Sequence, residues 1–232
     1  MNILKLRKEE MAESVIMALL LALVGGFLDA YTYVLRGGVF ATMQTGNMIL
    51  LVINGFNLNW TKCFSYLIPL LVFAVGSVLS EIIKDVFKKN KVGWRQTSLI
   101  VEVLMLIGTI FIPFGSASIY ANCLISFVAA IQVNGFNRMR GHTFFTTMCT
   151  GNLRTGSLFL YKGIRKKETE LLIKSLRYFA VIIFFMLGVL IGISLFESMK
   201  QFSILIPCAI LIVCYFILYI KVDVPDSTKN NE

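Results

Sequence analysis

The residues best suited to bind a substrate form one polar phrase that the chain contains twice. Residues 42–47 read TMQTGN and residues 147–152 read TMCTGN, 105 positions apart in an otherwise largely apolar sequence. Hydroxyl and amide groups beside glycine can line a pathway for a small molecule or ion. The candidate residues are Thr42, Thr45, Gly46 and Asn47 in the first copy, and Thr147, Thr150, Gly151 and Asn152 in the second.

Further polar residues stand close to these phrases. Asp29 is an ionisable residue inside an apolar run, which is costly in a membrane and therefore a functional candidate. The structural alternative is that Arg36, seven residues later on the same helical face, neutralises it. At the 105-residue offset Asp29 corresponds to Asn134, and Gln132 lies two residues before Asn134.

Arg154 follows the second phrase, whereas Ile49 occupies the equivalent position after the first. This asymmetry indicates that the second segment binds or filters something negative, with contact to lipid headgroups as the alternative. Glu102 lies near one end of an apolar run. We expect it to form a structural or gating ion pair with Arg140, with Arg138 and Arg154 as alternative partners; the alternative role is that of a substrate ligand.

The sequence does not favour catalytic or metal chemistry. The five cysteines are scattered, there is no Cys-x-x-Cys pair, and the chain has one histidine. Metal sites and nucleophilic catalysis need clustered Cys, His or carboxylate residues. We therefore expect no metal, no cofactor and no enzymatic activity.

The elements that position these residues are predicted to be membrane helices. The chain of 232 residues is 57% hydrophobic and only 15% charged, which is unusual for a soluble domain. A crossing takes about 20 apolar residues. Six runs qualify, at 15–35, 64–83, 98–116, 119–137, 176–196 and 202–220. Two shorter segments, at about 39–56 and 143–161, carry the Thr-Gly-Asn phrases.

The basic residues favour an interpretation in which the short segments enter and leave the membrane on one side. If both crossed, nine basic residues would face outside. If both are re-entrant, 19 of the 22 lie inside and only Arg36, Lys62 and Lys200 lie outside, as the positive-inside rule requires. This predicts both termini in the cytoplasm. The net charge of +9 is then explained by contact with anionic lipid, without nucleic acid.

The repeated phrases and three crossings per half predict an inverted repeat, a plan common to transporters. The fold class is an all-α polytopic membrane protein of six transmembrane helices plus two re-entrant half-helix segments, in one domain. The first repeat covers 14–117 with its re-entrant segment at 37–62, and the second covers 118–222 with its segment at 141–162. A polar tail follows at 223–232. The half-helices are expected to start near the Thr-Gly-Asn turns, because Thr and Asn cap helices well.

Residues 25–47, GGFLDAYTYVLRGGVFATMQTGN, and residues 131–152, IQVNGFNRMRGHTFFTTMCTGN, resemble the YoaK/DUF1275 family of bacterial integral membrane proteins. The resemblance covers most of the chain. It implies a multi-spanning protein of the bacterial plasma membrane, and it implies no settled activity. The family often has adjacent Gln and Asn residues in the second half, whereas Val133 separates Gln132 from Asn134 here.

These observations predict a small-molecule transporter or channel, tolerant of anions, with its site between the two Thr-Gly-Asn turns. The alternatives are a non-transporting scaffold or lipid-binding protein and, less favoured, an intramembrane enzyme. The expected partners are a small-molecule or ion substrate and the lipid bilayer. The small-residue pairs Gly76 with Ser80 and Gly188 with Gly192 suit close helix contacts, either internally or in a homodimer.

Overall fold

The computed structural model describes residues 14–87, 91–136, 138–139, 142–143 and 149–218. Within these residues the chain is helical, apart from a hairpin of two short strands, β1 (Arg138–Met139) and β2 (His142–Thr143). The helices are α2 (Val15–Leu35), α3 (Gln44–Phe56), α4 (Trp60–Val86), α5 (Lys91–Gly108), α6 (Ser118–Gly135), α7 (Cys149–Lys166), α8 (Thr169–Met199) and α9 (Leu205–Ile217). Two 3₁₀ turns, η1 (Thr109–Phe111) and η2 (Lys200–Ile204), continue α5 and join α8 to α9.

Five stretches of the described chain are long and apolar enough to cross a membrane. They are Val15–Leu35, Trp60–Val86, Gly93–Phe111, Ser118–Gly135 and Thr169–Ile217. The last contains both α8 and α9, and the chain changes direction between them at Lys200, whose φ is 46°. Neither α3 nor α7 is among these stretches. The prediction of a helical membrane protein is therefore confirmed.

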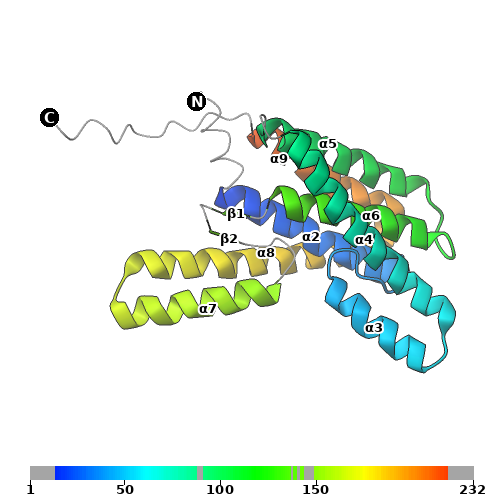
Figure 1. Ribbon diagram of the computed structural model, residues 1–232, viewed down its shortest axis with the longest axis horizontal. Helices are drawn as coiled ribbons and strands as arrows, with labels where there is room; N and C mark the ends of the chain where they lie inside the picture. The colour runs from blue at the N-terminus through cyan, green and yellow to red at the C-terminus, as the bar shows by residue number, and fades with distance from the viewer. Residues whose placement is uncertain (1–13, 88–90, 137, 140–141, 144–148, 219–232) are drawn as a thin grey trace.

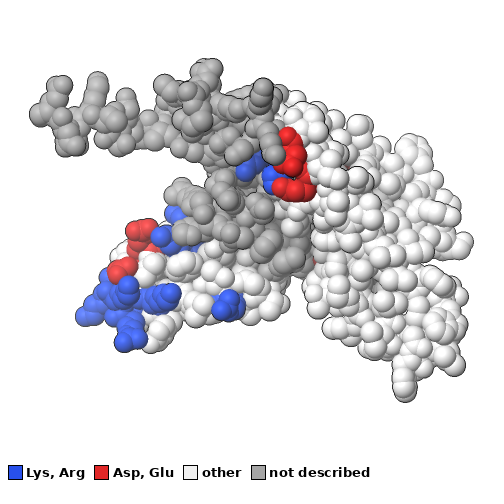
Figure 2. Space-filling model, in the orientation of Figure 1, with Lys and Arg blue, Asp and Glu red and all other residues white. Residues whose placement is uncertain are grey.

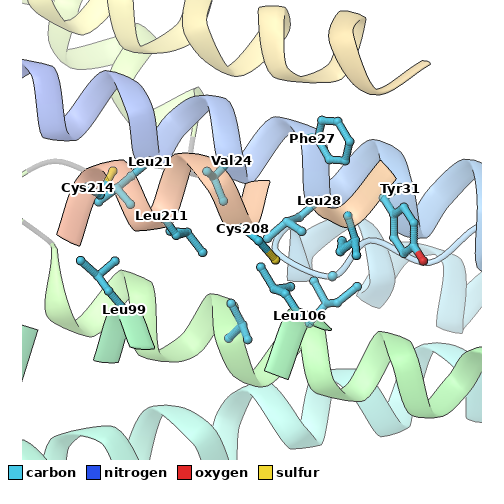
Figure 3. Packing of buried hydrophobic residues seen from close by; sticks show 14 of the residues in the cluster. Leu21, Val24, Phe27, Leu28, Tyr31, Leu99, Leu106, Cys208, Leu211 and Cys214 are labelled. Carbon is cyan, nitrogen blue, oxygen red and sulfur yellow. The ribbon is translucent and has the colours of Figure 1, made fainter. Parts of the chain in front are cut away.

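The helix α2 lies at the centre of the fold, and its neighbours approach it closely. It packs against α8 and α9. A Cβ atom at Gly188 of α8 would lie 2.0 Å from the backbone oxygen of Leu23, and one at Gly26 would lie 2.0 Å from that of Phe185. The glycines therefore allow backbone-to-backbone contact between α2 and α8. On the other side, leucines of α2 share an apolar core with α5 and α9 (Figure 3).

The two shorter helices lie at opposite ends of the molecule. α3 packs on the start of α4, and α7 packs on α8. Figure 1 shows the α3–α4 turn at one end and the α7–α8 turn at the other, while the inner ends of α3 and α7 both lie near α2. In the face drawn in Figure 2, charged side chains gather over the α7–α8 turn and near the α4–α5 connection, and the opposite end carries none.

Candidate functional site

The candidate site is built around the non-helical segment that joins α2 to α3. The chain leaves α2 through Gly37 and Gly38, whose φ angles of 97° and 80° favour glycine. It then passes through Val39 and Ala41, which are buried. Backbone groups buried at membrane depth must find partners within the protein, because lipid offers none.

Side chains of α2 supply partners for this segment. Asp29 accepts one hydrogen bond from the backbone N–H of Thr42, with Oδ1 at 2.8 Å, and one from its hydroxyl, with Oδ2 at 2.6 Å. The Oγ1 of Thr32 accepts a hydrogen bond from the N–H of Ala41 at 3.2 Å. These bonds hold the segment against the C-terminal third of α2.

The other side of the segment is held by α6. The Asn122 amide donates to the backbone oxygen of Arg36 at 3.0 Å, and the Ser126 hydroxyl donates to that of Ala41 at 3.0 Å. Both side chains are buried. The irregular segment is thus enclosed between two membrane helices, each of which contributes polar side chains to satisfy it.

Asn47 closes the first Thr-Gly-Asn phrase back onto the same segment. Its Oδ1 accepts a hydrogen bond from the N–H of Phe40 at 2.9 Å, and its Nδ2 donates to the backbone oxygen of Phe40 and to Gln44. The Asn47 side chain is fully buried. A Cβ atom at Gly46 would lie 2.8 Å from the Phe40 ring, so glycine lets the ring pack against the helix. Thr45 is exposed.

The start of α3 differs from the expectation that Thr or Asn of the phrase would cap it. α3 begins at Gln44, its N-cap residue Met43 makes no side-chain capping bond, and Thr45 to Asn47 lie in the first turn. The Asp29 carboxyl group faces the backbone N–H groups of Thr42 and Met43 instead. A carboxylate at this position is favourable because the N-terminal end of a helix is electropositive.

Arg36 does not neutralise Asp29, which corrects the structural alternative drawn from their spacing. Its guanidinium donates to the backbone oxygens of Thr109, Ile112 and Pro113 at 2.9, 2.8 and 3.2 Å, and to the hydroxyl of Tyr31. It also stacks over the ring of Phe114, 4.3 Å from the centroid. With 1% of its surface exposed, Arg36 is stabilised by the carbonyl-rich end of η1 and the turn after it.

The second Thr-Gly-Asn phrase lies in the first turn of α7, which begins at Cys149. Asn152 is buried, like its counterpart Asn47, while Thr150, Gly151 and Arg154 are exposed. The Cys149 thiol lies within electrostatic range of Asp29, so the starts of α3 and α7 approach the same part of α2. Thr147 lies outside the described residues.

Three other predicted residues belong to separate contacts. Gln132 of α6 donates to Oε2 of Glu102 at 3.4 Å, and both side chains are buried. Asn134 donates to the backbone oxygen of Ser77 and the hydroxyl of Ser80, which fastens α6 to α4. Asn134 therefore contacts a neighbouring helix, whereas Asp29, which precedes it by the 105-residue offset, contacts the non-helical segment before α3. Arg140, the expected partner of Glu102, and the tail at 223–232 lie outside the described residues.

The sequence interpretation missed Thr32, Asn122 and Ser126, which hold the connecting segment. A signal for them exists. Asp29 and Thr32 are three residues apart, and Asn122 and Ser126 are four apart, so each pair lies on one helical face within an apolar run. Two polar faces of this kind indicate that an irregular segment lies between them.

The comparisons with known proteins identify a family for this chain. The family described as "Protein of unknown function (DUF1275)" matches residues 17–218, which is most of the chain, and this confirms the resemblance drawn from the two polar phrases. No curated protein and no solved structure matches the chain.

Proposed function

The chain belongs to the DUF1275 family, and from that premise we propose that it is a membrane transporter or channel for a small molecule or ion. One observation carries the proposal. Two helices, α3 and α7, begin near Asp29 in the C-terminal third of α2, and Val39, Ala41 and Thr42 before α3 are non-helical and buried. Helices that start within a membrane domain, after irregular backbone, are typical of substrate sites in transporters.

The candidate residues divide into two groups. Asp29, Thr42 and Asn47 form hydrogen bonds with one another or with the connecting segment. We therefore assign them a structural role, which is to fix the start of α3. Buried Asn152 is assigned the same task for α7. The exposed residues Thr45, Thr150, Gly151 and Arg154 are left to face a substrate.

The preference for an anion rests on the second half of the chain. At the start of α3 the Asp29 carboxyl group already faces the backbone N–H groups. At α7, Thr150 and Gly151 of the first turn are exposed, and so is Arg154 about one turn later. An anionic group is favoured there by the helix end and by the guanidinium.

The packing of the helices supports the inverted repeat. If α2 is exchanged with α6, α3 with α7, α4 with α8 and α5 with α9, each main contact maps onto another. The contact of α2 with α8 becomes that of α6 with α4, the pair α3 with α4 becomes α7 with α8, and α5 with α9 maps onto itself. We therefore retain the repeats 14–117 and 118–222 as part of the proposal, with both termini in the cytoplasm of a bacterium.

A swelling assay tests transport without knowing the substrate. Proteoliposomes are placed in isosmotic potassium nitrate, potassium formate, urea or glycerol, with valinomycin in the salt solutions so that potassium can follow the anion. We expect at least one solute to enter faster than into protein-free liposomes. We expect Arg154→Ala to reduce anion entry at least fivefold, while Arg165→Ala, an exposed basic residue at the far end of α7, leaves it unchanged. Entry that equals the protein-free rate for every solute would refute transport of these solute classes.

A second candidate function is a lipid-binding scaffold without flux and, like the first, without catalysis. The observation that favours it is the basic end of α7. Four exposed basic residues lie there: Lys162, Arg165, Lys166 and Lys167. Such a cluster attracts anionic lipid. Salt-sensitive retention of phosphatidylglycerol together with absent swelling would favour the scaffold over the transporter.

A further inference from the structure

Glu102 of α5 lies at the midpoint of the candidate span Gly93–Phe111. Nine residues separate it from either end, or about 13 Å of helix. The sequence predicts that the span begins at residue 98, which would place Glu102 about one turn from its end. α5 begins at Lys91 instead, so Glu102 lies deeper in the span. No part of the Glu102 side chain is exposed. Leu99 and Leu106 lie on the same face of α5, within the apolar core that α5 shares with α2 and α9 (Figure 3).

The two carboxylate oxygens of Glu102 have unequal surroundings. Oε2 accepts a long hydrogen bond of 3.4 Å from the amide of Gln132, whereas Oε1 is buried and has no hydrogen-bond partner. Asp29 provides the contrast within the same membrane domain, because Thr42 donates to both of its oxygens at 2.8 and 2.6 Å. An ionised carboxylate is costly when it is buried in a membrane helix and one of its oxygens has no hydrogen-bond donor, and a bound proton lowers that cost because it removes the charge.

We propose that Glu102 is a proton-binding site in the middle of the membrane, that Oε1 is the oxygen that takes the proton, and that Gln132 positions the carboxyl group through Oε2. The neighbours suit a proton better than a metal cation. Calcium and magnesium need about six oxygen ligands, whereas Gln132 presents its NH₂ group and α9 contributes the thiol of Cys214, which lies within electrostatic range.

The other charged group on this face of α5 is engaged elsewhere. Arg95, seven residues before Glu102, donates its Nε to the backbone oxygen of Gly135 at 3.1 Å. η1, which also packs on α5, contributes only Thr109, Ile110 and Phe111. A surface groove of about 290 Å³ between α5 and α9 is almost wholly apolar and includes Val103, the residue after Glu102. It offers a hydrophobic reagent a route from the lipid.

The role assigned to this proton rests on the proposed transport function. Uptake and release of a proton at Glu102 would couple substrate movement to a proton gradient. The binding of the proton itself does not require transport, so the two can fail separately.

Infrared spectroscopy of the full-length protein in liposomes is the decisive test. We expect a C=O stretching band of a protonated carboxyl group in the wild type and loss of that band in Glu102→Gln. The matched controls are Glu81→Gln, which alters an exposed acid on α4, and Asp29→Asn, which alters the other buried acid; both should keep the Glu102 band. Persistence of the full band in Glu102→Gln would overturn the proposal.

Labelling with dicyclohexylcarbodiimide gives an independent measurement. The carboxyl proton moves to a carbodiimide nitrogen, the carboxylate oxygen bonds to the central carbon, and rearrangement gives a stable N-acylurea with no leaving group. Mass spectrometry should find one added reagent molecule at Glu102 of the wild type. The amount of bound reagent should be at least tenfold lower in Glu102→Gln and unchanged in Glu81→Gln. Equal labelling in Glu102→Gln and in the wild type would contradict the proposal. A labelled protein that shows no swelling would leave the proton site intact and refute only transport.

Discussion

Replacing Thr42 with valine removes the hydroxyl that donates to Oδ2 of Asp29 at 2.6 Å. That distance falls in the range of charge-assisted O–H···O bonds. Valine keeps the size and branching of threonine, so packing changes little, but a buried carboxylate oxygen loses its donor. Hydrogen bonds to charged groups contribute about 1.5–3 kcal/mol, and an unserved buried acceptor costs a similar amount. We therefore expect Thr42→Val to lower the free energy of unfolding by about 2–3 kcal/mol.

The assay is thermal denaturation of detergent-purified protein at one fixed heating rate, followed by the remaining monodisperse fraction. For a chain of this length, each kcal/mol corresponds to about 2–4 °C, so the midpoint should fall by about 4–12 °C. Thr45→Val is the matched control. It makes the same change three residues later, at an exposed position in the first turn of α3, and should alter stability by no more than about 0.5 kcal/mol.

A double-mutant cycle with Asp29→Asn separates the contact from other effects of the substitution. Because the two side chains touch, we expect their effects to be non-additive by about 1 kcal/mol or more. Two results would refute the structural role of Asp29 in holding the segment before α3. One is equal destabilisation by Thr42→Val and Thr45→Val, and the other is an additive cycle.

Two further predictions concern the packing around α2. Gly188→Ala should lower the free energy of unfolding by about 3 kcal/mol, because its Cβ would lie 2.0 Å from the backbone oxygen of Leu23. The control Gly151→Ala, whose Cβ would meet nothing within 4 Å, should change the denaturation midpoint little. Equal shifts of the midpoint in the two variants would contradict the close contact. Arg36→Lys should lower stability by about 2 kcal/mol, because an ammonium cannot serve three carbonyls and a hydroxyl with the geometry of a guanidinium. The exposed Arg154→Lys is its control in the same denaturation assay, and a similar midpoint for both would refute the buried role of Arg36.

Several features of this protein could be predicted from the sequence because they depend on local composition. Apolar runs of about 20 residues predict membrane helices whatever the tertiary structure of the chain. The repeated Thr-Gly-Asn phrase marked the starts of α3 and α7 to within a few residues, because the polar residues and glycine interrupt apolar runs. The same phrases carried the resemblance to the DUF1275 family, which the match over residues 17–218 confirms.

Partner choice could not be predicted in this way, because it depends on how distant segments meet. Asp29 and Arg36 lie seven residues apart with opposite charge, so their spacing left an ion pair open as an alternative. Tertiary structure decides otherwise. The segment before α3 folds back to bring Thr42 to Asp29, and the end of η1 brings carbonyl groups to Arg36. The buried charged groups of Asp29 on α2 and of Arg36 directly after it are thus stabilised by chain segments that lie further along the sequence.

The sequence by itself determined which residues are polar inside the membrane, because apolar surroundings make such residues conspicuous. Only the tertiary structure decided what each of them does. Asn134 and Asp29 are separated by the same 105 residues as the two Thr-Gly-Asn phrases, yet one binds α4 and the other holds the segment before α3. Glu102 became a candidate proton site only when folding placed it among leucines with one oxygen unserved. The physical reason is that a buried polar group is defined by the partners it finds, and those partners come from distant parts of the chain.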